Sequence, residues 1–481
     1  MSNYKPTIGL EVHVELKTRT KMFCDCINDP DEKKPNTNVC PICLGHPGTL
    51  PFPNKKAIES IIKIGLALNG KPNDKFHFDR KNYFYPDLPK AYQISQAGEP
   101  IILGGTLRNI KINHIHLEED AGKLIHDDVS GGTLVDFNRA SVPLMELVTE
   151  PDIHTPEDAI AFMKDLQLIV RYLGVSDADL ERGQMRADAN ISISETDELG
   201  TRAEIKNLNS FRSVFGAINY EIKRQAELLE KGEKIKQETR GWDDLRQKTI
   251  SQRSKEESQD YRYFPEPDIP HFSIDAFDVE RIKTEIPELP EAKLKRFEKE
   301  YNLSTDQARF LVEEIELAEY FEEAVSELQM INEKASISTL YNYLTSDLRG
   351  LMNQSGINLS DAVNDISSLK VTPQNLAYLA YQVDSNNITS RQAKDILKKM
   401  FETGSSAREI IENEKIGISD SSEIEAVVMA VIAENYVAVA DYKKGKTASL
   451  QFLIGKAMGI LKGRARPDEL KEIFERNLNQ F

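Results

Sequence analysis

The sequence predicts an α+β fold, in which an N-terminal domain on a mostly antiparallel sheet is followed by all-α helical and tail domains. In TIGLEVHVEL, the apolar residues from Ile8 to Leu16 alternate with Glu11, His13 and Glu15, which is the period of a half-buried strand. NIKINHIHLEED and MRADANISI alternate in the same way. Beyond residue 294, long segments instead have the three-and-four spacing of helices, with acidic residues on the exposed faces.

Helices are expected between the N-terminal strands. KKAIESIIKIGLALNG ends at Gly70, as a helix C-cap does, and PEDAIAFMKDLQLIVRYLG spaces its apolar residues at three and four before Gly174. The Pro-rich EIPELPEAK marks the change to a helical pattern, and the Gly/Ser break in ETGSSAREI marks a further boundary. We therefore predict three domains, at 1–294, 295–405 and 406–481.

Composition bounds the class of protein. The 481 residues leave room for two to four domains at roughly 100 to 200 residues each. A formal net charge of -17, taken as a uniform property, argues against a protein that coats nucleic acid or membrane. The sequence has no run of 18 apolar residues and no basic N-terminal segment followed by an apolar run. We therefore expect no membrane association, no secretory signal and a cytoplasmic location.

The charge is uneven along the chain. Residues 442–467 contain seven Lys and Arg residues and no acid. Such a segment can bind a phosphate backbone through release of counterions, although a basic solvated helix or a surface for a partner protein would give the same pattern. These candidate nucleic-acid-binding cations are Lys443, Lys444, Lys446, Lys456, Lys462, Arg464 and Arg466.

Four cysteines give the strongest single motif. Cys24 and Cys26 are followed, after a polar loop that contains Pro and Asn, by Cys40 and Cys43. Two close pairs can place four thiolates at the corners of a tetrahedron, as in closed structural zinc sites. Four reduced cysteines without a metal, or a redox pair at Cys40 and Cys43, are the alternatives. Because four sulfur ligands leave no open position for a substrate, such a zinc would hold a loop and perform no catalysis.

Carboxylates recur on the predicted strands and at their ends. Beside Glu11 and His13, the sequence offers acids in HLEEDAGK, VPLMELVTEPD and MRADANISI. So many carboxylates in one domain would repel one another unless a cation lay among them, and oxygen ligands with one imidazole suit Mg²⁺ or Mn²⁺. Dispersed surface acids that never meet are the other interpretation. The sequence has no P-loop and no dinucleotide-binding glycine motif, so a nucleotide would bind in another way.

Eight segments, in order between residues 8 and 270, closely resemble the B subunit of the bacterial glutamyl/aspartyl-tRNA amidotransferase. They are IGLEVHVELKTRTKMFC, DRKNYFYPDLPKAYQISQ, HLEEDAGK, TEPD, RADANIS, EIKNLNSF, QETRGWDD and DYRYFPEPDIP. The resemblance implies a cradle-like catalytic domain at 1–294 that uses ATP and Mg²⁺ to phosphorylate the side-chain carboxyl of Glu-tRNA(Gln) or Asp-tRNA(Asn). It also implies a partner amidase, the A subunit, that supplies ammonia from glutamine, and a small C subunit that braces the heterotrimer.

The resemblance also implies roles for individual residues. Matched by motif, Glu11, His13, Glu119 and Glu150 would form the cluster that binds Mg²⁺ and activates the carboxyl group. The four cysteines match a zinc motif that part of the family has, and the basic segment matches the family's tRNA-binding tail. Residues that would hold ATP or the aminoacyl end are Lys81, Lys90, Lys123, Arg186, Asp188, Asn190 and Lys206.

Two other functions are weighed against the ligase. A non-catalytic, zinc-containing adaptor that binds tRNA would have the same cysteines and basic tail, but it would not need His13 close to carboxylates that can share a metal. A free-standing glutaminase is disfavoured, because the sequence has neither an amidase Ser-Ser-Lys pattern nor a cysteine outside the predicted zinc site.

Overall fold

The computed structural model describes residues 4–127, 131–254, 261–356, 369–417, 421–461 and 464–478. Contacts divide the chain into two compact units, Met1–Pro290 and Glu291–Phe481. The first unit mixes strands and helices and the second is helical, which confirms the predicted α+β class. No helix within the described ranges has the length and hydropathy needed to cross a lipid bilayer.

A large sheet dominates the first unit, and β1 lies at its centre. The strands are arranged in the order β15-β14-β13-β12-β1-β11-β8-β6-β2, with β7 paired to β8. Every pair along this path is antiparallel except β13 with β14. The bounds of these strands are β1 Lys5–Glu15, β2 Lys71–Pro72, β6 Ile102–Leu103, β7 Thr106–Leu107, β8 Ile110–Glu119, β11 Pro143–Thr149, β12 Met185–Ser194, β13 Ala203–Leu208, β14 Glu238–Asp243 and β15 Lys248–Ser254.

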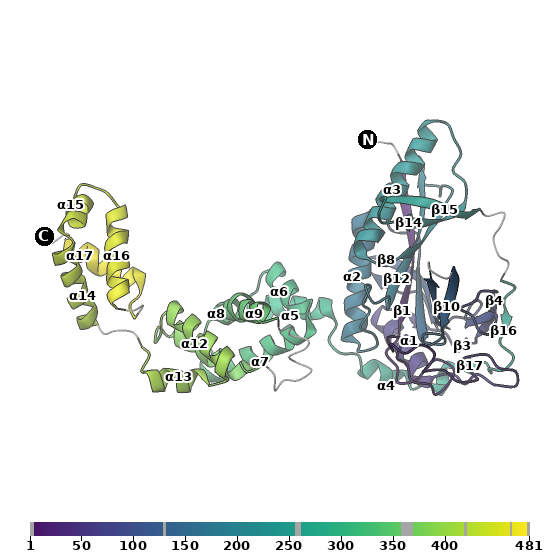
Figure 1. Ribbon diagram of the computed structural model, residues 1–481, viewed down its shortest axis with the longest axis horizontal. Helices are drawn as coiled ribbons and strands as arrows, with labels where there is room; N and C mark the ends of the chain where they lie inside the picture. Colours follow the sequence, from purple (N-terminus) through teal and green to yellow (C-terminus); the bar gives the residue numbers. More distant parts are fainter. Residues whose placement is uncertain are drawn as a thin grey trace. The chain divides into compact units, whose positions relative to one another are not determined.

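Three helices cover the apolar face of this sheet. They are α1 (Lys55–Ala67), α2 (Pro156–Tyr172) and α3 (Phe211–Glu230), and each begins at a side chain that caps backbone N–H groups: Asn54, Thr155 and Ser210. Their buried residues form one hydrophobic core with the apolar residues of β1, from Ile8 to Leu16. Figure 1 shows α2 and α3 on one side of the sheet and the small strands on the other. The opposite, polar face of β1 is therefore left for a site.

Small strands build the remainder of the first unit. A three-stranded sheet has the order β16-β4-β5, and two-stranded sheets pair β9 with β10 and β3 with β17. Their bounds are β3 Lys75–Phe76, β4 Asp79–Asn82, β5 Tyr92–Ser95, β9 Lys123–Asp127, β10 Gly132–Asp136, β16 Phe264–Pro265 and β17 Phe272–Ser273. They are followed by the 3-10 turn η2 (Ile274–Ala276) and the short helix α4 (Val279–Thr284).

The second unit contains helices only in its described residues. Phe297, Phe321 and Tyr341 are among its packed aromatic residues. Its earlier elements are α5 Pro290–Tyr301, α6 Thr305–Val312, α7 Ile315–Ile331, α8 Ile337–Asn342, the π-helical turn η3 Tyr343–Leu348, α9 Arg349–Gln354, α11 Pro373–Asp384, α12 Ser390–Thr403 and α13 Ala407–Glu414.

The last four helices have a hydrophobic core of their own, which extends from Ile424 to Leu478. They are α14 Ser421–Glu434, α15 Tyr436–Lys443, α16 Ala448–Ile460 and α17 Pro467–Leu478. The expected start of the tail domain at residue 406 stays a prediction. Since α13 contacts α11 and α12, the packing favours a boundary after α13, close to the start of α14.

Candidate functional site

The polar face of the central strands collects the candidate groups by strand register. In β1, His13 lies opposite Glu146 of β11 and Arg186 of β12. Glu146 in turn lies opposite His116 of β8. Residues directly opposite one another on antiparallel strands have side chains on the same face. Four neighbouring strands therefore present one continuous polar surface.

His13, Glu118 and Glu146 form the first group of potential metal ligands, with ligand atoms all within 4.8 Å of one another. His13 Nε2 lies 3.2 Å from Glu146 Oε2, and His116 Nε2 lies 3.5 Å from the same oxygen. Ser95 Oγ donates a hydrogen bond of 3.0 Å to Glu118 Oε2. Glu118 is only 3% exposed. Carboxylates this close and this buried need positive charge nearby, which Lys81 supplies in part, and a hard divalent metal with one imidazole ligand would suit the same atoms.

Electrostatics at this first group favour an ionised carboxylate. Burial opposes ionisation of Glu146, but attraction to His116 and the hydrogen bond from His13 outweigh it and hold its pKa well below the usual value. The Nδ1 atoms of His13 and His116 are buried and make no hydrogen bond within the described part of the chain. Such orphaned ring nitrogens are costly in a purely structural core, which agrees with a functional role for this cluster.

Glu11, Asp188 and Glu204 form a second group next to the first. Lys206 Nζ donates a hydrogen bond of 2.7 Å to Asp188 Oδ2 and lies 2.9 Å from Glu204. Burial opposes the charge on Lys206, but these two carboxylates outweigh it and raise its pKa. Asn190 Nδ2 donates to Glu11 Oε1 at 2.9 Å, and burial together with Glu146 raises the pKa of Glu11.

Glu146 of the first group and Glu11 and Glu204 of the second line one cavity of ≈600 Å³. This volume lies within the range of small-molecule sites, roughly 300 to 1,000 Å³. The Lys81 ammonium lies 5.3 Å from the centre of the Tyr261 ring; burial opposes its charge, but Glu118 and Glu146 are among the groups that outweigh burial and raise its pKa. The cavity is lined by Glu11, Lys81, Ser95, Gln96, Ala97, His114, His116, Glu146, Val148, Arg202, Glu204, Lys206, Gln237, Glu238, Thr239, Tyr261 and Tyr263.

Glu119 and Glu150, which were expected to join His13, belong to neither group of potential ligands. Glu119 Oε2 accepts a hydrogen bond of 2.8 Å from Lys90 Nζ, and its Oε1 accepts one from the backbone N–H of Ile94. Glu150 lies beyond a bulge at the end of β11 and accepts from Asn113 Nδ2 at 2.6 Å. The side chains that the structure brings to His13 are the neighbouring acids of the same motifs, Glu118 and Glu146.

The other residues expected to hold ATP or the aminoacyl end are spread more widely. Lys81 and Lys206 line the cavity. Arg186 donates to both carboxylate oxygens of Asp120, at 3.1 and 3.0 Å. Lys123 is exposed at the start of β9. Sequence reasoning missed Glu204 and His116 as members of the site.

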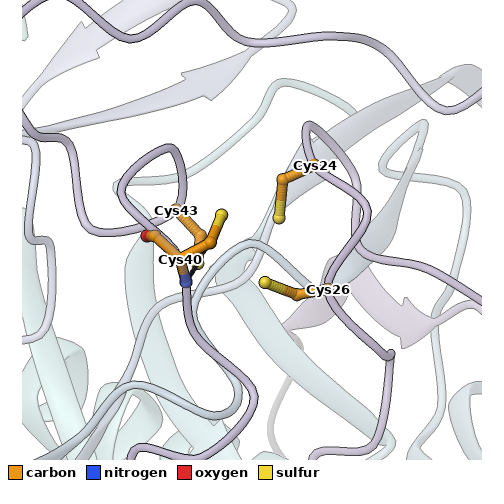
Figure 2. Close-up of side chains that lie close together, drawn as sticks. All are labelled: Cys24, Cys26, Cys40 and Cys43. Atoms are coloured by element: carbon orange, nitrogen blue, oxygen red, sulfur yellow. Dashed lines mark hydrogen bonds between the residues drawn. The ribbon is translucent and has the colours of Figure 1, made fainter.

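The four cysteines converge from two loops. Figure 2 shows Cys24 and Cys26 on one loop facing Cys40 and Cys43 on another, and all four Sγ atoms lie within 4.8 Å of one another. The Sγ atoms of Cys40 and Cys43 are 3.9 Å apart. A tetrahedral metal with bonds of about 2.3 Å to sulfur requires sulfur atoms about 3.8 Å apart. The hydrogen bond between the Cys24 and Cys43 thiols lowers the pKa of Cys43 and raises that of Cys24, and a bound metal would take all four as thiolates.

The described part of the basic segment near the C-terminus is exposed at its cations, three of which have polar partners. Lys446 pairs with Asp441, and Arg464 with Glu423. Arg466 donates to Asn386 Oδ1 at 3.0 Å. Lys443 and Lys444 are exposed at the end of α15, Lys456 lies 5.7 Å from the Phe452 ring, and Lys462 is outside the described residues.

Most of the chain matches known proteins. Residues 6–280 match the family model described as the GatB/GatE catalytic domain, and residues 319–478 match the model described as the GatB domain. A protein of Dehalococcoides mccartyi, named as the B subunit of aspartyl/glutamyl-tRNA(Asn/Gln) amidotransferase, is 45% identical over 100% of both chains. Proteins of the same name from Thermotoga maritima and Brevibacillus brevis are 44% and 43% identical, over 99% and 100% of both chains. The chain therefore belongs to the family of aspartyl/glutamyl-tRNA(Asn/Gln) amidotransferase B subunits.

Proposed function

We propose that this chain is the B subunit of a tRNA-dependent amidotransferase and that its cavity activates the side-chain carboxyl of Glu-tRNA(Gln), Asp-tRNA(Asn) or both. A carboxylate oxygen attacks the γ-phosphorus of ATP, and ADP leaves. Ammonia then attacks the carbonyl carbon of the acyl phosphate, inorganic phosphate leaves with one former carboxylate oxygen, and a proton is lost to give the amide. A carboxylate is a poor electrophile, and phosphorylation gives it a leaving group.

Glu11, His13, Glu118 and Glu146 would hold Mg²⁺, which offsets the charge that gathers as the phosphate and carboxylate anions are joined. Lys81 and Lys206 would add positive charge at the cavity wall, where phosphate oxygens need it. The observation that carries this proposal is the convergence of His13 with Glu118 and Glu146, the last of which lines the cavity together with those two lysines.

Cys24, Cys26, Cys40 and Cys43 would hold a structural Zn²⁺ that fixes their two loops and takes no part in the reaction. Ammonia would come from glutamine through a partner A subunit, and a C subunit would brace the heterotrimer. The exposed cations between Lys443 and Arg466 would bind the tRNA backbone. The alternative is a non-catalytic tRNA-binding adaptor, which would need the cysteines and the basic segment but not the carboxylates of the cavity.

The experiment that separates these two functions is reconstitution with the A and C partners, ATP, Mg²⁺, glutamine and Glu-tRNA(Gln). We expect tRNA-dependent ADP release that the His13→Ala variant loses while tRNA binding remains. If His13→Ala folds normally and keeps full ADP release, the assignment of the site is wrong. If the wild-type complex releases no ADP but the chain binds tRNA, the adaptor function is favoured.

A further inference from the structure

His77, Glu99 and His271 form another group of potential metal ligands in the first unit, with ligand atoms within 4.8 Å of one another. Strand pairing brings these three distant segments together. Phe272 of β17 lies opposite Phe76 of β3, which places His271 beside His77. Asp79 of β4 lies opposite Ser95 of β5, which brings the loop that carries Glu99 to the same place. None of these side chains lines the cavity described above.

Asp79 fixes the orientation of the His77 ring. His77 Nε2 lies 3.1 Å from Asp79 Oδ1. The other oxygen of Asp79 accepts hydrogen bonds from the backbone N–H groups of Ala97 and Gly98, at 2.8 and 3.3 Å. Because Asp79 is only 4% exposed and held in this way, it acts as an acceptor, and Nε2 carries the proton. Histidines that bind metals commonly donate their second nitrogen to a carboxylate in this manner.

The second nitrogen of His77 then meets another carboxylate. Nδ1 lies 3.3 Å from Glu99 Oε2, and in a ring protonated at Nε2 this nitrogen presents a lone pair to an anion. Either a second proton makes His77 an imidazolium between two carboxylates, or a cation lies between Nδ1 and Glu99. The position of His271 favours the cation, because it brings a second imidazole donor to the same point.

The two imidazole rings stack with their centres 4.6 Å apart and an angle of 18° between their planes. For both rings to face one ion, a ring must turn about its Cβ–Cγ bond. His271 is exposed, and this torsion is broad in histidine, so the rotation is accessible at small cost.

We propose that His77, Glu99 and His271 bind a divalent transition metal, with water in the remaining positions and Asp79 as a positioning residue for His77. Two imidazoles and one carboxylate suit Zn²⁺ better than Mg²⁺ or Ca²⁺, which prefer oxygen ligands. The site differs in chemistry from the four thiols and from the carboxylate groups of the cavity.

The bound metal would also fix one wall of the cavity. Ser95, at the end of β5, lines that cavity, as do Gln96 and Ala97, which begin the loop that carries Glu99. Gln96 Nε2 donates to the backbone carbonyl of His77 at 2.9 Å, and Gln96 Oε1 accepts from the backbone N–H of Leu117 in β8 at 3.1 Å. A metal that ties Glu99 to His77 and His271 would therefore hold this loop against β8.

Zinc binding to the untagged full-length chain tests the proposal. The protein is dialysed against buffered micromolar Zn²⁺ with excess Mg²⁺, which occupies the carboxylate groups, and bound zinc is measured by elemental analysis. We expect His271→Ala and Glu99→Gln each to bind one zinc per chain fewer than wild type, while the cysteine site stays filled. His126→Ala is the matched control, because His126 is an exposed histidine of β9 that faces Thr133.

Equal zinc content in wild type, His271→Ala and Glu99→Gln would overturn the proposal and would favour the imidazolium. A thermal readout gives a second, independent answer. Added Zn²⁺ should raise the Tm of wild type and His126→Ala more than that of His271→Ala. The same zinc-dependent shift in all three proteins would also contradict the site.

Discussion

Glu146→Gln tests the cavity site with a change that preserves the shape of the side chain. In the metal-free protein the Glu146 carboxylate is attracted to the His13 and His116 rings, but it also repels the carboxylates of Glu118 and Glu11. Loss of the two attractions and relief of the repulsions oppose each other. Because attraction prevails and holds the pKa of Glu146 well below its usual value, we expect the metal-free variant to be less stable than metal-free wild type, and the test is the response of each protein to Mg²⁺.

Mg²⁺ should affect the two proteins differently. Loss of a residue that merely orients a ligand costs roughly 10- to 100-fold in metal affinity, and loss of a ligand should cost at least as much. At a Mg²⁺ concentration of about 100 times the wild-type Kd, bound metal stabilises wild type by about 2.7 kcal/mol. A variant with a 100-fold weaker site gains only about 0.4 kcal/mol under the same conditions. The difference of about 2.3 kcal/mol corresponds to a Tm shift of about 4 °C for a unit of this size.

Thermal unfolding with and without Mg²⁺ measures this difference, and Glu150→Gln is the matched control. Glu150 is an acid of the same motif, but it accepts from Asn113 and belongs to neither group of potential ligands. Glu150→Gln should keep the wild-type response to Mg²⁺. If Glu146→Gln keeps that response, or if Glu150→Gln loses it, the choice of Glu146 over Glu150 is refuted.

Four other perturbations reach the remaining parts of the chain. Cys43→Ser should lower bound zinc by one per chain and lower the Tm, because a structural zinc contributes to folding; elemental analysis that finds no zinc in freshly purified wild type would refute the site. Removing residues 421–481, which begin at α14, should weaken tRNA binding far more than ATP binding, as measured by filter binding and calorimetry, since the basic segment would contact only tRNA; equal losses would contradict this assignment. Burial and the nearby His116 lower the pKa of His114 to about 4. Between about pH 6.5 and 4 the unfolded chain therefore binds a proton that the folded chain does not bind. The free energy of unfolding should decrease as the pH is lowered through this window, and it should decrease less steeply in His114→Gln. Phe321 is fully buried among Phe297, Tyr301 and Tyr341. The Phe321→Ala variant should therefore lose about 3 to 5 kcal/mol of unfolding free energy, measured by urea unfolding. A loss under about 1 kcal/mol would show that the second unit is not packed as described.

The fold class could be predicted because its signals are local. The alternation in TIGLEVHVEL fixes both the strand and its polar face, and the structure places Glu11 and His13 on that face. Alternation along a strand also decides which of two neighbouring acids lies on its polar face. In β8, His116 and Glu118 share one face, and the buried Ile115 and Leu117 share the other. By the same alternation, Glu119 belongs to the face of Ile115 and Leu117. In β11, Glu146 likewise lies between the buried Met145 and Leu147.

Long-range pairings could not be predicted from the sequence. Lys206 reaches Asp188 because β13 pairs with β12 across a connecting loop, and a register shift between Ala187 and Ala189 adjusts where it lies. His77 and His271 are 194 positions apart and meet only because β17 pairs with β3. The cysteine motif could be recognised from its spacing, because two close pairs can place four sulfur atoms within reach of one ion.

Oxygen transfer from the substrate shows whether the carboxyl group is phosphorylated in the cavity. The reconstituted complex is given Glu-tRNA(Gln) in which both side-chain carboxyl oxygens are ¹⁸O, together with ATP, Mg²⁺ and glutamine, and the inorganic phosphate is analysed by mass spectrometry. If ATP phosphorylates this carboxyl group, one ¹⁸O atom appears in the phosphate for each amide formed, and the Glu146→Gln variant transfers little. Amide formation with unlabelled phosphate, or with the label in AMP, would contradict the proposed reaction.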